Sequence, residues 1–288
     1  MEKRLLDFFE KEKIKLYSVL DFNQCHILAQ DKIFKYFGDH TPKSVFLILV
    51  PYLVKSVLED PQRNISLYAA IPDYHVFFKR FLSELSELLQ ELYPGYTFAG
   101  FSDNSPIDER HAALLSGLGT IGDNHLLLTE EYSSFIFISE IISDMPVSMY
   151  HFQSPPQKPA PQCLHCRNCT NSCPVYRDGI DCLSMVTQKK GELSDAEIAA
   201  IRKYQTAWGC DICQLNCPIT QRAIQKGSIY TEIAYFQDNA VNRIHSDMIQ
   251  TMDKETFRTR AFAWRGRNCI LRNLKILEEN GADKINGT

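Results

Sequence analysis

Residues 163–174 read CLHCRNCTNSCP and place four cysteines, at spacings of three, three and four residues, ahead of a proline. The order C-x2-C-x2-C-x3-C-P is typical of bacterial ferredoxins, in which three thiolates bind one [4Fe–4S] cluster and the fourth binds another. A second half-motif follows, with Cys182 and then GCDICQLNCP at residues 209–218. Two four-iron clusters need eight thiolates, and residues 163–217 supply that number.

The ferredoxin pattern also predicts how these thiolates divide between the two clusters. The first set is Cys163, Cys166, Cys169 and Cys217, and the second is Cys173, Cys182, Cys210 and Cys213. Structural zinc is the alternative, because C-x2-C pairs also bind zinc. A C-x3-C-P ending that occurs twice has no purpose at a zinc site, so we favour clusters that carry single electrons.

The remaining composition describes a chain that can bury a sizeable core, since 44% of its 288 residues are hydrophobic. The formal net charge of −4 does not indicate nucleic-acid binding along the whole chain. The N-terminal twenty residues lack the apolar core of a signal peptide, and the apolar runs at 45–54 and 135–142 are too short to span a bilayer. We therefore expect a cytoplasmic protein without membrane contact, whose ten cysteines serve metal or redox chemistry rather than disulfides.

The order of the predicted elements indicates an α+β fold with three parts. Strand-like runs in the first part are KLYSVLDF, SVFLILVPYL, YTFAGFSD and SSFIFISEII, and a long amphipathic helix begins near Pro72. This mixture predicts an α+β domain over 1–153, followed by a Pro-rich linker at 154–162. Residues 163–225 then form the double-cluster domain, and 226–288 form a helical C-terminal segment.

Two polar stretches of the first domain carry candidate site residues. In SDNSPIDERHAALLSGLGTIGDNHLLL, residues 102–128, four charged residues precede a glycine-rich segment. Taken alone, the charged residues are typical of a capped helix start, and GLGTIG is typical of a tight turn rather than of a dinucleotide loop. In SLYAAIPDYH, residues 66–75, Asp73 beside Pro72 is equally consistent with a helix cap.

Taken in order, however, these segments resemble the epoxyqueuosine reductases, which are cobalamin-dependent iron–sulfur enzymes of tRNA modification. TPKSVFLILVPYL resembles the first core strand of that family, and SLYAAIPDYH resembles its YA-x-G-x-DYH stretch. Residues 102–128 resemble its D-x-x-P-x-x-E-R and AGLGWIGKN elements, and the eight cysteines match residue for residue. Each motif alone is weak, but their shared order is specific.

The resemblance implies a fold, an activity and a set of site residues. The N-terminal domain would be a corrinoid-binding domain of the nitroreductase and reductive-dehalogenase type, ahead of the ferredoxin-like part. Electrons from an external low-potential donor would pass through two [4Fe–4S] clusters to cobalamin and reduce epoxyqueuosine in tRNA to queuosine. Asp103 matches the proton donor of the family. The implied cofactor-binding residues are Tyr68, Asp73, His75, Gly117, Gly119, Gly122 and Asn124.

The chain also departs from the family pattern. Thr120 replaces the usual tryptophan and Asp123 the usual lysine, and no D-x-H-x-x-G motif is present to supply a cobalt-ligating histidine. We expect a short member that lacks the C-terminal HEAT-like repeats of many relatives. A basic run near the C-terminus could contact RNA phosphates, with Trp264 available for stacking; its candidate residues are Arg258, Arg260, Arg265 and Arg267. A basic helical face without RNA is the alternative for this run.

A second class of function stays open at this point. A two-cluster electron-transfer protein, with or without a corrinoid, would share the cysteine pattern and serve another substrate or partner without RNA. The intact SDNSP and DYH motifs favour the reductase, whereas Asp123 and the short C-terminus favour the electron-transfer protein.

Overall fold

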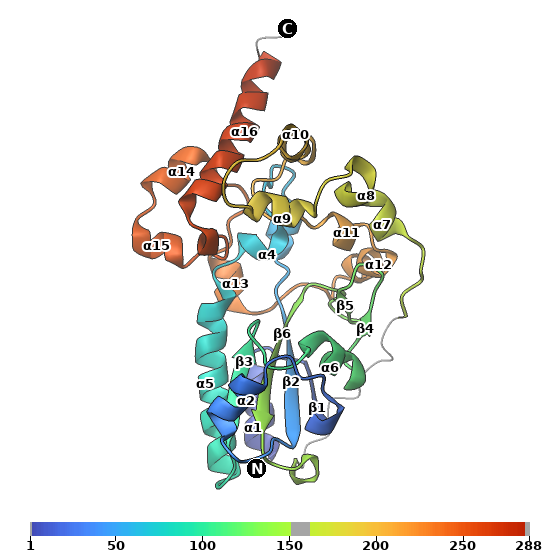
Figure 1. Cartoon of the computed structure of the whole chain (residues 1–288), viewed down its shortest axis with the longest axis vertical. Coiled ribbons are helices and arrows are strands. Elements are labelled where there is room, and N and C mark those ends of the chain that lie inside the picture. The colour runs from blue at the N-terminus through green and yellow to red at the C-terminus, as the bar shows by residue number, and fades with distance from the viewer. Residues whose placement is uncertain (1, 151–161, 286–288) are drawn as a thin grey trace. The chain divides into compact units, whose positions relative to one another are not determined.

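The computed structural model describes residues 2–150 and 162–285, and the order of its elements can be followed in Figure 1. Contacts divide the chain into two compact units, and each is described by itself. Unit 1 holds residues 1–52, 75–165 and 222–233, and unit 2 holds residues 53–74, 166–221 and 234–288. The mixture of helices and strands confirms the α+β class.

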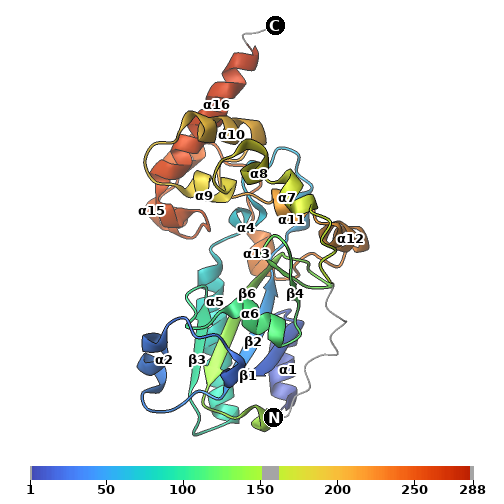
Figure 2. The same ribbon diagram turned by 45° about the vertical axis from the view of Figure 1, so that its right-hand side comes forward.

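Unit 1 is built on a four-stranded antiparallel sheet with the order β1-β2-β6-β3, which Figure 2 shows from a second side. The strands are β1 (Leu16–Asp21), β2 (Ser44–Pro51), β3 (Phe98–Ser102) and β6 (Ile136–Ser143). All four lie where the apolar and β-branched runs of the sequence predict them. Every residue of β2 is buried, because helices or loops cover both faces of this central strand.

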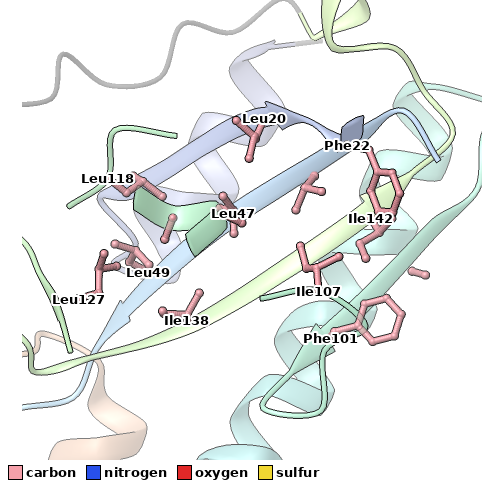
Figure 3. Close-up of a cluster of buried hydrophobic side chains, with 14 of the residues drawn as sticks. Leu20, Phe22, Leu47, Leu49, Phe101, Ile107, Leu118, Leu127, Ile138 and Ile142 are labelled. Carbon is pink, nitrogen blue, oxygen red and sulfur yellow. The ribbon is translucent and has the colours of Figure 1, made fainter. Parts of the chain in front are cut away.

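Helices cover the two faces of this sheet. On one face, α1 (Glu2–Lys11) and α5 (Tyr74–Leu92) pack through aromatic rings, including the pairs Phe9–Phe46 and Phe78–Phe137. The opposite face holds the apolar cluster of Figure 3, to which η1 (Phe22–Gln24), α2 (Gln30–Phe37) and α6 (Glu109–Leu115) contribute. Alternate β2 residues face the two sides, as the period of two in a strand requires. The short helix η2 (Val147–Met149) follows β6.

The glycine-rich segment forms a tight turn, as its sequence predicts. Asp108 caps α6, and its carboxylate accepts a hydrogen bond from the His111 amide at 3.1 Å. Gly117 follows the helix with a φ of +78°, a value that favours glycine, and leads into the hairpin of β4 (Thr120–Ile121) and β5 (Leu127–Leu128).

Unit 2 is helical in the part that the structure describes. Its helices before the C-terminal segment are α3 (Lys55–Leu58), α4 (Leu67–Ala70), α7 (Asn168–Ser172), α8 (Pro174–Asp178), α9 (Leu183–Gln188), α10 (Asp195–Tyr204) and α11 (Ile212–Leu215). The boundary with unit 1 falls within α12 (Pro218–Lys226). The C-terminal helices are α13 (Ala234–Asp238), α14 (Ser246–Thr251), α15 (Lys254–Arg258), η3 (Ala263–Arg265) and α16 (Arg267–Ile285). An apolar cluster centred on Leu183 and Ile201 supports this unit, in which Trp208 is also fully buried.

The two units do not follow the predicted domain ranges. Residues 53–74 belong to unit 2 because their backbone pairs with the cysteine region: the Ser66 amide donates to the Trp208 carbonyl at 2.7 Å, and the Ala207 amide donates to the Asn64 carbonyl at 2.6 Å. Such long-range pairing leaves no signal in local sequence. The predicted linker 154–162 lies outside the described residues except for Gln162. Across the described residues, no helix is both long and apolar enough to cross a membrane.

Candidate metal centre and active site

All ten cysteines lie in the described part of the chain, and none forms a disulfide. Several of the predicted ligands sit at the ends of short helices. Cys173 precedes α8, which begins with Pro174, and Cys217 directly precedes α12, which begins with Pro218. Proline suits the first position of a helix because its missing N–H group has no partner there in any case. The x3-C-P endings therefore place a thiol immediately before each of these two helices.

The four cysteines of the predicted second cluster set all belong to unit 2. Burial raises the pKa of the Cys213 thiol, and the neighbouring Cys173, Cys182 and Cys169 contribute to a value of about 11. The pKa of Cys210 is raised to about 12, mainly by burial and also by Cys213 and Cys182. Cys210 and Cys213, whose pKa values are raised in this way, need a bound cation before both can be thiolates. This donor set is therefore suited to an iron–sulfur cluster, and zinc would satisfy the same electrostatic need.

The predicted first set is divided between the two units. Cys163 belongs to unit 1, and Cys166, Cys169 and Cys217 belong to unit 2. The loop between Cys163 and Cys169 contains two residues with positive φ, His165 at +48° and Arg167 at +61°. Backbone of this kind turns sharply and exposes successive amides, which can donate to cluster sulfurs.

A buried aspartate supports the cysteine loop, and the sequence analysis missed it. Asp211 lies between Cys210 and Ile212 and is only 5% exposed. One of its oxygens accepts hydrogen bonds from the Leu67 amide and from the Arg63 guanidinium, both at 2.9 Å. Burial raises the pKa of Asp211, and Arg63 opposes that shift. These hydrogen bonds hold the cysteine loop against residues 63–67. The aspartate within the sequence GCDICQ is the feature that could have predicted this role.

The conformation and close packing of Gly209 explain why the GCDICQLNCP motif begins with glycine. Its φ is +72°, and an added Cβ atom would lie 2.5 Å from the Ser66 Cβ atom and closer still to its hydroxyl. Its amide donates to the Thr187 hydroxyl at 2.9 Å, and the buried Asn273 amide donates to the carbonyls of Thr187 and Ala207. Hydrogen bonds thus connect the loop to α9 and α16.

The predicted proton donor Asp103 lies in unit 1, directly after β3, with a φ of +62°. Non-glycine residues in this conformation are strained and concentrate at functional sites. An Asp103 carboxylate oxygen lies 3.2 Å from Nε2 of His75, in the first turn of α5, and these side chains are 45% and 55% exposed. The structure therefore brings together two of the predicted residues and leaves both accessible to a ligand.

Two further carboxyl groups surround Asp103. Burial and, to a lesser extent, the Asp103 charge raise the pKa of Glu109, the first residue of α6, to about 7. Glu140 is fully buried on β6, and its pKa is raised well above the usual range, first by burial and then by Glu109. Neither Glu140 oxygen has a hydrogen bond of normal geometry, although the nearby Ser105 hydroxyl lowers the pKa somewhat. The sequence analysis missed Glu140.

The other predicted cofactor residues have local structural roles. In unit 2, the Tyr68 hydroxyl accepts from the Trp208 indole at 3.1 Å, and the Asp73 carbonyl accepts from the Tyr235 hydroxyl at 3.0 Å. In unit 1, a Cβ atom at Gly119 would meet the Leu128 carbonyl at 2.7 Å, and one at Gly122 would meet the Asn124 side chain at 2.8 Å. These glycines are therefore required by the hairpin itself, whatever ligand it binds.

Asp123, where the chain departs from the family pattern, has a histidine as its partner. Its carboxylate lies 2.9 Å from Nδ1 of His165, and a ligand atom of Cys163 lies within 4.8 Å of both. Asp123, which stands where the family usually has lysine, thus forms an ion-pair geometry with a histidine inside the first cysteine motif.

Two of the four predicted RNA-binding arginines are engaged elsewhere. Arg260 is buried, and its guanidinium donates to the carbonyls of Ala70 and Asn239 at 2.9 and 2.7 Å. Arg267 donates to four backbone carbonyls between Ile249 and Asp253. Both serve the helical scaffold of unit 2, which corrects the expectation that the whole run is available to phosphates. Arg258 and Arg265 are exposed.

Sequence comparisons relate the chain to curated epoxyqueuosine reductases, while no protein-family model matches it. It is 33% identical over 187 residues to the enzyme of Gloeobacter violaceus, covering 61% of this chain and 55% of that one. It is 33% identical over 207 residues to the enzyme of Francisella cf. novicida, covering 67% and 53%. The chain thus spans about half the length of these curated relatives.

Structural comparisons agree on the fold. Epoxyqueuosine reductase from Streptococcus thermophilus superposes with a TM-score of 0.72 at 21% identity, over 99% of this chain and 82% of that one. A structure of epoxyqueuosine reductase with an epoxyqueuosine-modified tRNA-Tyr stem loop gives 0.72 at 19% identity, over 96% and 80%. The enzyme from Bacillus subtilis, with its catalytic aspartate loop swung out of the active site, gives 0.70 at 19% identity, over 98% and 82%.

Proposed function

The chain belongs to the epoxyqueuosine reductase family, and from that premise we propose that it reduces epoxyqueuosine in tRNA to queuosine. The observation that supports the proposal is the mutual proximity of Cys182, Cys210 and Cys213 in a chain whose fold is shared with those enzymes. Thiols grouped in this way serve electron transfer, and the half-exposed Asp103 supplies an acid within the same chain.

We propose two [4Fe–4S] clusters and cobalamin as the cofactors. The two cysteine sets defined by the sequence would hold the clusters. In unit 1, residues on the Gly117–Asn124 hairpin and His75 would contact the corrinoid. When bound, these groups would supply the low-potential electrons that the reduction needs, from an external donor.

The contribution of the chain itself is the delivery of protons. Reduction of an epoxide to an alkene takes up two electrons and two protons and releases the oxygen as water. In our proposal Asp103 gives a proton to the departing oxygen. The 3.2 Å contact with Nε2 of His75 can fix the orientation of the Asp103 carboxyl group.

For RNA, we propose a contact surface made by Arg258, Trp264 and Arg265. The Trp264 side chain is 60% exposed, and the Arg265 guanidinium lies 3.9 Å from the centre of its ring. An exposed indole with a cation beside it can stack on an unpaired base while the charge attracts phosphate. Tyrosine tRNA carrying epoxyqueuosine is the ligand in one structurally similar relative.

The alternative, a two-cluster electron-transfer protein without RNA, is favoured by Asp123 and its contact with His165. Anaerobically purified protein from cobalamin-fed cells separates the two functions. We expect roughly eight irons per chain, a corrinoid absorption band, and conversion of epoxyqueuosine in tRNA to queuosine, measured by mass spectrometry of digested nucleosides.

Failure would take distinct forms in this experiment. Iron and corrinoid without queuosine formation would favour the electron-transfer protein, and zinc at two ions per chain without iron would overturn the cluster assignment. Replacing Cys182 with alanine should reduce the iron content to about half, because only one of two clusters loses a ligand.

A further inference from the structure

The contact between Asp123 and His165 lies beside a predicted cluster ligand. The Asp123 carboxylate and Nδ1 of His165 are 2.9 Å apart, and the Cys163 sulfur lies within 4.8 Å of both atoms. All three residues belong to unit 1, and they come from two segments, the turn between β4 and β5 and the first cysteine loop. A carboxylate and an imidazole therefore meet next to a thiol, although 42 positions separate Asp123 from His165 in the sequence.

The turn that carries Asp123 is closed by backbone hydrogen bonds on both sides of this residue. The Gly122 amide donates to the Leu126 carbonyl at 3.0 Å, and the His125 amide donates to the Gly122 carbonyl at 2.8 Å. The Arg110 guanidinium of α6 donates to the His125 carbonyl at 2.9 Å and connects the turn with that helix. The backbone at residue 123 is therefore held in place by several contacts, which fix the direction in which its side chain leaves the turn.

His165 approaches this turn from a strained backbone. Its φ is +48°, a conformation that non-glycine residues adopt rarely and mainly at functional sites. The imidazole is 77% exposed, whereas the Asp123 side chain is 32% exposed. A side chain that is largely exposed gains little from packing, so burial does not account for the strain. The loop conformation instead places the imidazole against Asp123 beside Cys163.

A carboxylate at this distance acts on the charge of a cluster that Cys163 would bind. Reduction adds one electron, and therefore one negative charge, to a [4Fe–4S] cluster without making or breaking a bond. A nearby anion opposes the added charge, and its effect is larger where protein replaces part of the surrounding water. Net charge is among the factors that set the potential of a cluster. The Asp123 charge would therefore make the reduced cluster a stronger reductant.

We propose that Asp123, held by His165, lowers the reduction potential of the [4Fe–4S] cluster bound through Cys163. This inference rests on the clusters of the proposed function, in which electrons from an external donor pass through them toward cobalamin. Neither Asp123 nor His165 is a cluster ligand in this arrangement. The carboxylate acts through its charge, and the imidazole is a positioning residue that keeps the carboxylate near the thiolate. A lower potential gives each transferred electron a larger driving force.

A graded series at residue 123 tests the effect of charge without turnover. Anaerobically purified protein is titrated with a reductant at a fixed pH of 8, and electron paramagnetic resonance follows the reduction of the two clusters. Asp123→Asn removes one negative charge and Asp123→Lys reverses it, so one potential should rise in the order Asp, Asn, Lys. The other potential should move less, because charge interactions weaken with distance. Iron should stay at roughly eight per chain throughout the series.

Two further variants separate charge from position. Glu91→Gln is the matched control, because Glu91 is also an ion-paired carboxylate of unit 1, 2.6 Å from Arg4, but lies near the end of α5. Its replacement should shift neither potential. His165→Gln keeps the Asp123 charge and releases the carboxylate, so it should raise the same potential as Asp123→Asn, but by less.

The outcomes distinguish this inference from the proposed function. Two intact clusters whose potentials are the same with Asp, Asn and Lys at residue 123 would overturn the inference. A graded shift in a parent protein that never forms queuosine from epoxyqueuosine in tRNA would overturn the proposed function alone. A protein purified without iron would overturn the proposed clusters, and the inference with them.

Discussion

At the scale of single residues, Asp103 offers the sharpest test of the proposed chemistry. Asp103→Asn keeps the shape and the contact with His75 but cannot donate an acidic proton. We expect it to retain iron and corrinoid while its turnover falls by about 10²–10⁴-fold, the usual loss on removal of a general acid. Queuosine formation in single-turnover and steady-state assays measures the effect.

Asp108 is the matched control for this variant, since it lies five residues away and serves as the cap of α6. Asparagine caps helices about as well as aspartate, so Asp108→Asn should leave both activity and stability near those of the parent. Equal rates for Asp103→Asn and the parent would show that the proton comes from another group.

The raised pKa of Glu109 predicts a pH dependence of stability. Its value of about 7 lies above the usual 4.5, so the folded state binds more protons than the unfolded state between these values. Stability contributed by this group is therefore present at low pH and is lost as the pH rises toward 7. Glu109→Gln removes that loss. The difference in melting temperature between this variant and the parent should therefore be more favourable to the variant at pH 8 than at pH 5. The same difference at both pH values would contradict the argument that burial raises the pKa of Glu109.

At the scale of elements, the loop before α11 is tightly constrained by Gly209. Alanine there combines an unfavourable positive φ, worth about 1–2 kcal/mol, with overpacking against Ser66 that costs about 1–3 kcal/mol. Gly209→Ala should therefore destabilise the protein by roughly 2–5 kcal/mol in urea unfolding and reduce the iron content.

Gly191→Ala separates the two causes. Gly191 also has a positive φ, +85°, but an added Cβ atom would have no neighbour within 4 Å. It should lose only the backbone contribution of about 1–2 kcal/mol. If both variants lose the same free energy of unfolding, the close approach to Ser66 has no energetic weight.

The elements also show what local sequence can and cannot predict. The strands and α5 follow from apolar runs and helical spacing, because these signals are local. The assignment of the eight cysteines to two clusters rests on their spacing and stays a prediction. Glu140 was not predicted, since a single acidic residue in FIFISEII does not reveal which neighbours surround it. Arg260 and Arg267 were assigned to RNA because sequence does not show that backbone carbonyls already accept from them.

At the scale of the whole molecule, the division into two units depends on contacts between residues far apart in the chain. Residues 53–74 pair with residues 207 and 208. The local pattern of a strand or helix does not show which distant residues pair with it. Domain ranges predicted as continuous segments therefore could not include this pairing. The family resemblance, by contrast, depends on the order of several motifs and is supported by the sequence relatives.

Binding of RNA by the whole protein tests the contact surface of Arg258, Trp264 and Arg265. Changing Arg258 and Arg265 together to alanine should weaken binding of an epoxyqueuosine tRNA stem loop and lower the slope of log K against log salt by roughly 1.4–1.8, as expected for two lost phosphate contacts. Changing Lys3 and Lys79, two exposed cations of unit 1, removes the same charge and should leave that slope nearly unchanged. Trp264→Ala should weaken binding without altering the slope, because stacking releases no counterions. If the two arginines and the two lysines have equal effects, attraction is a property of overall charge, and the surface around Trp264 is not the RNA site.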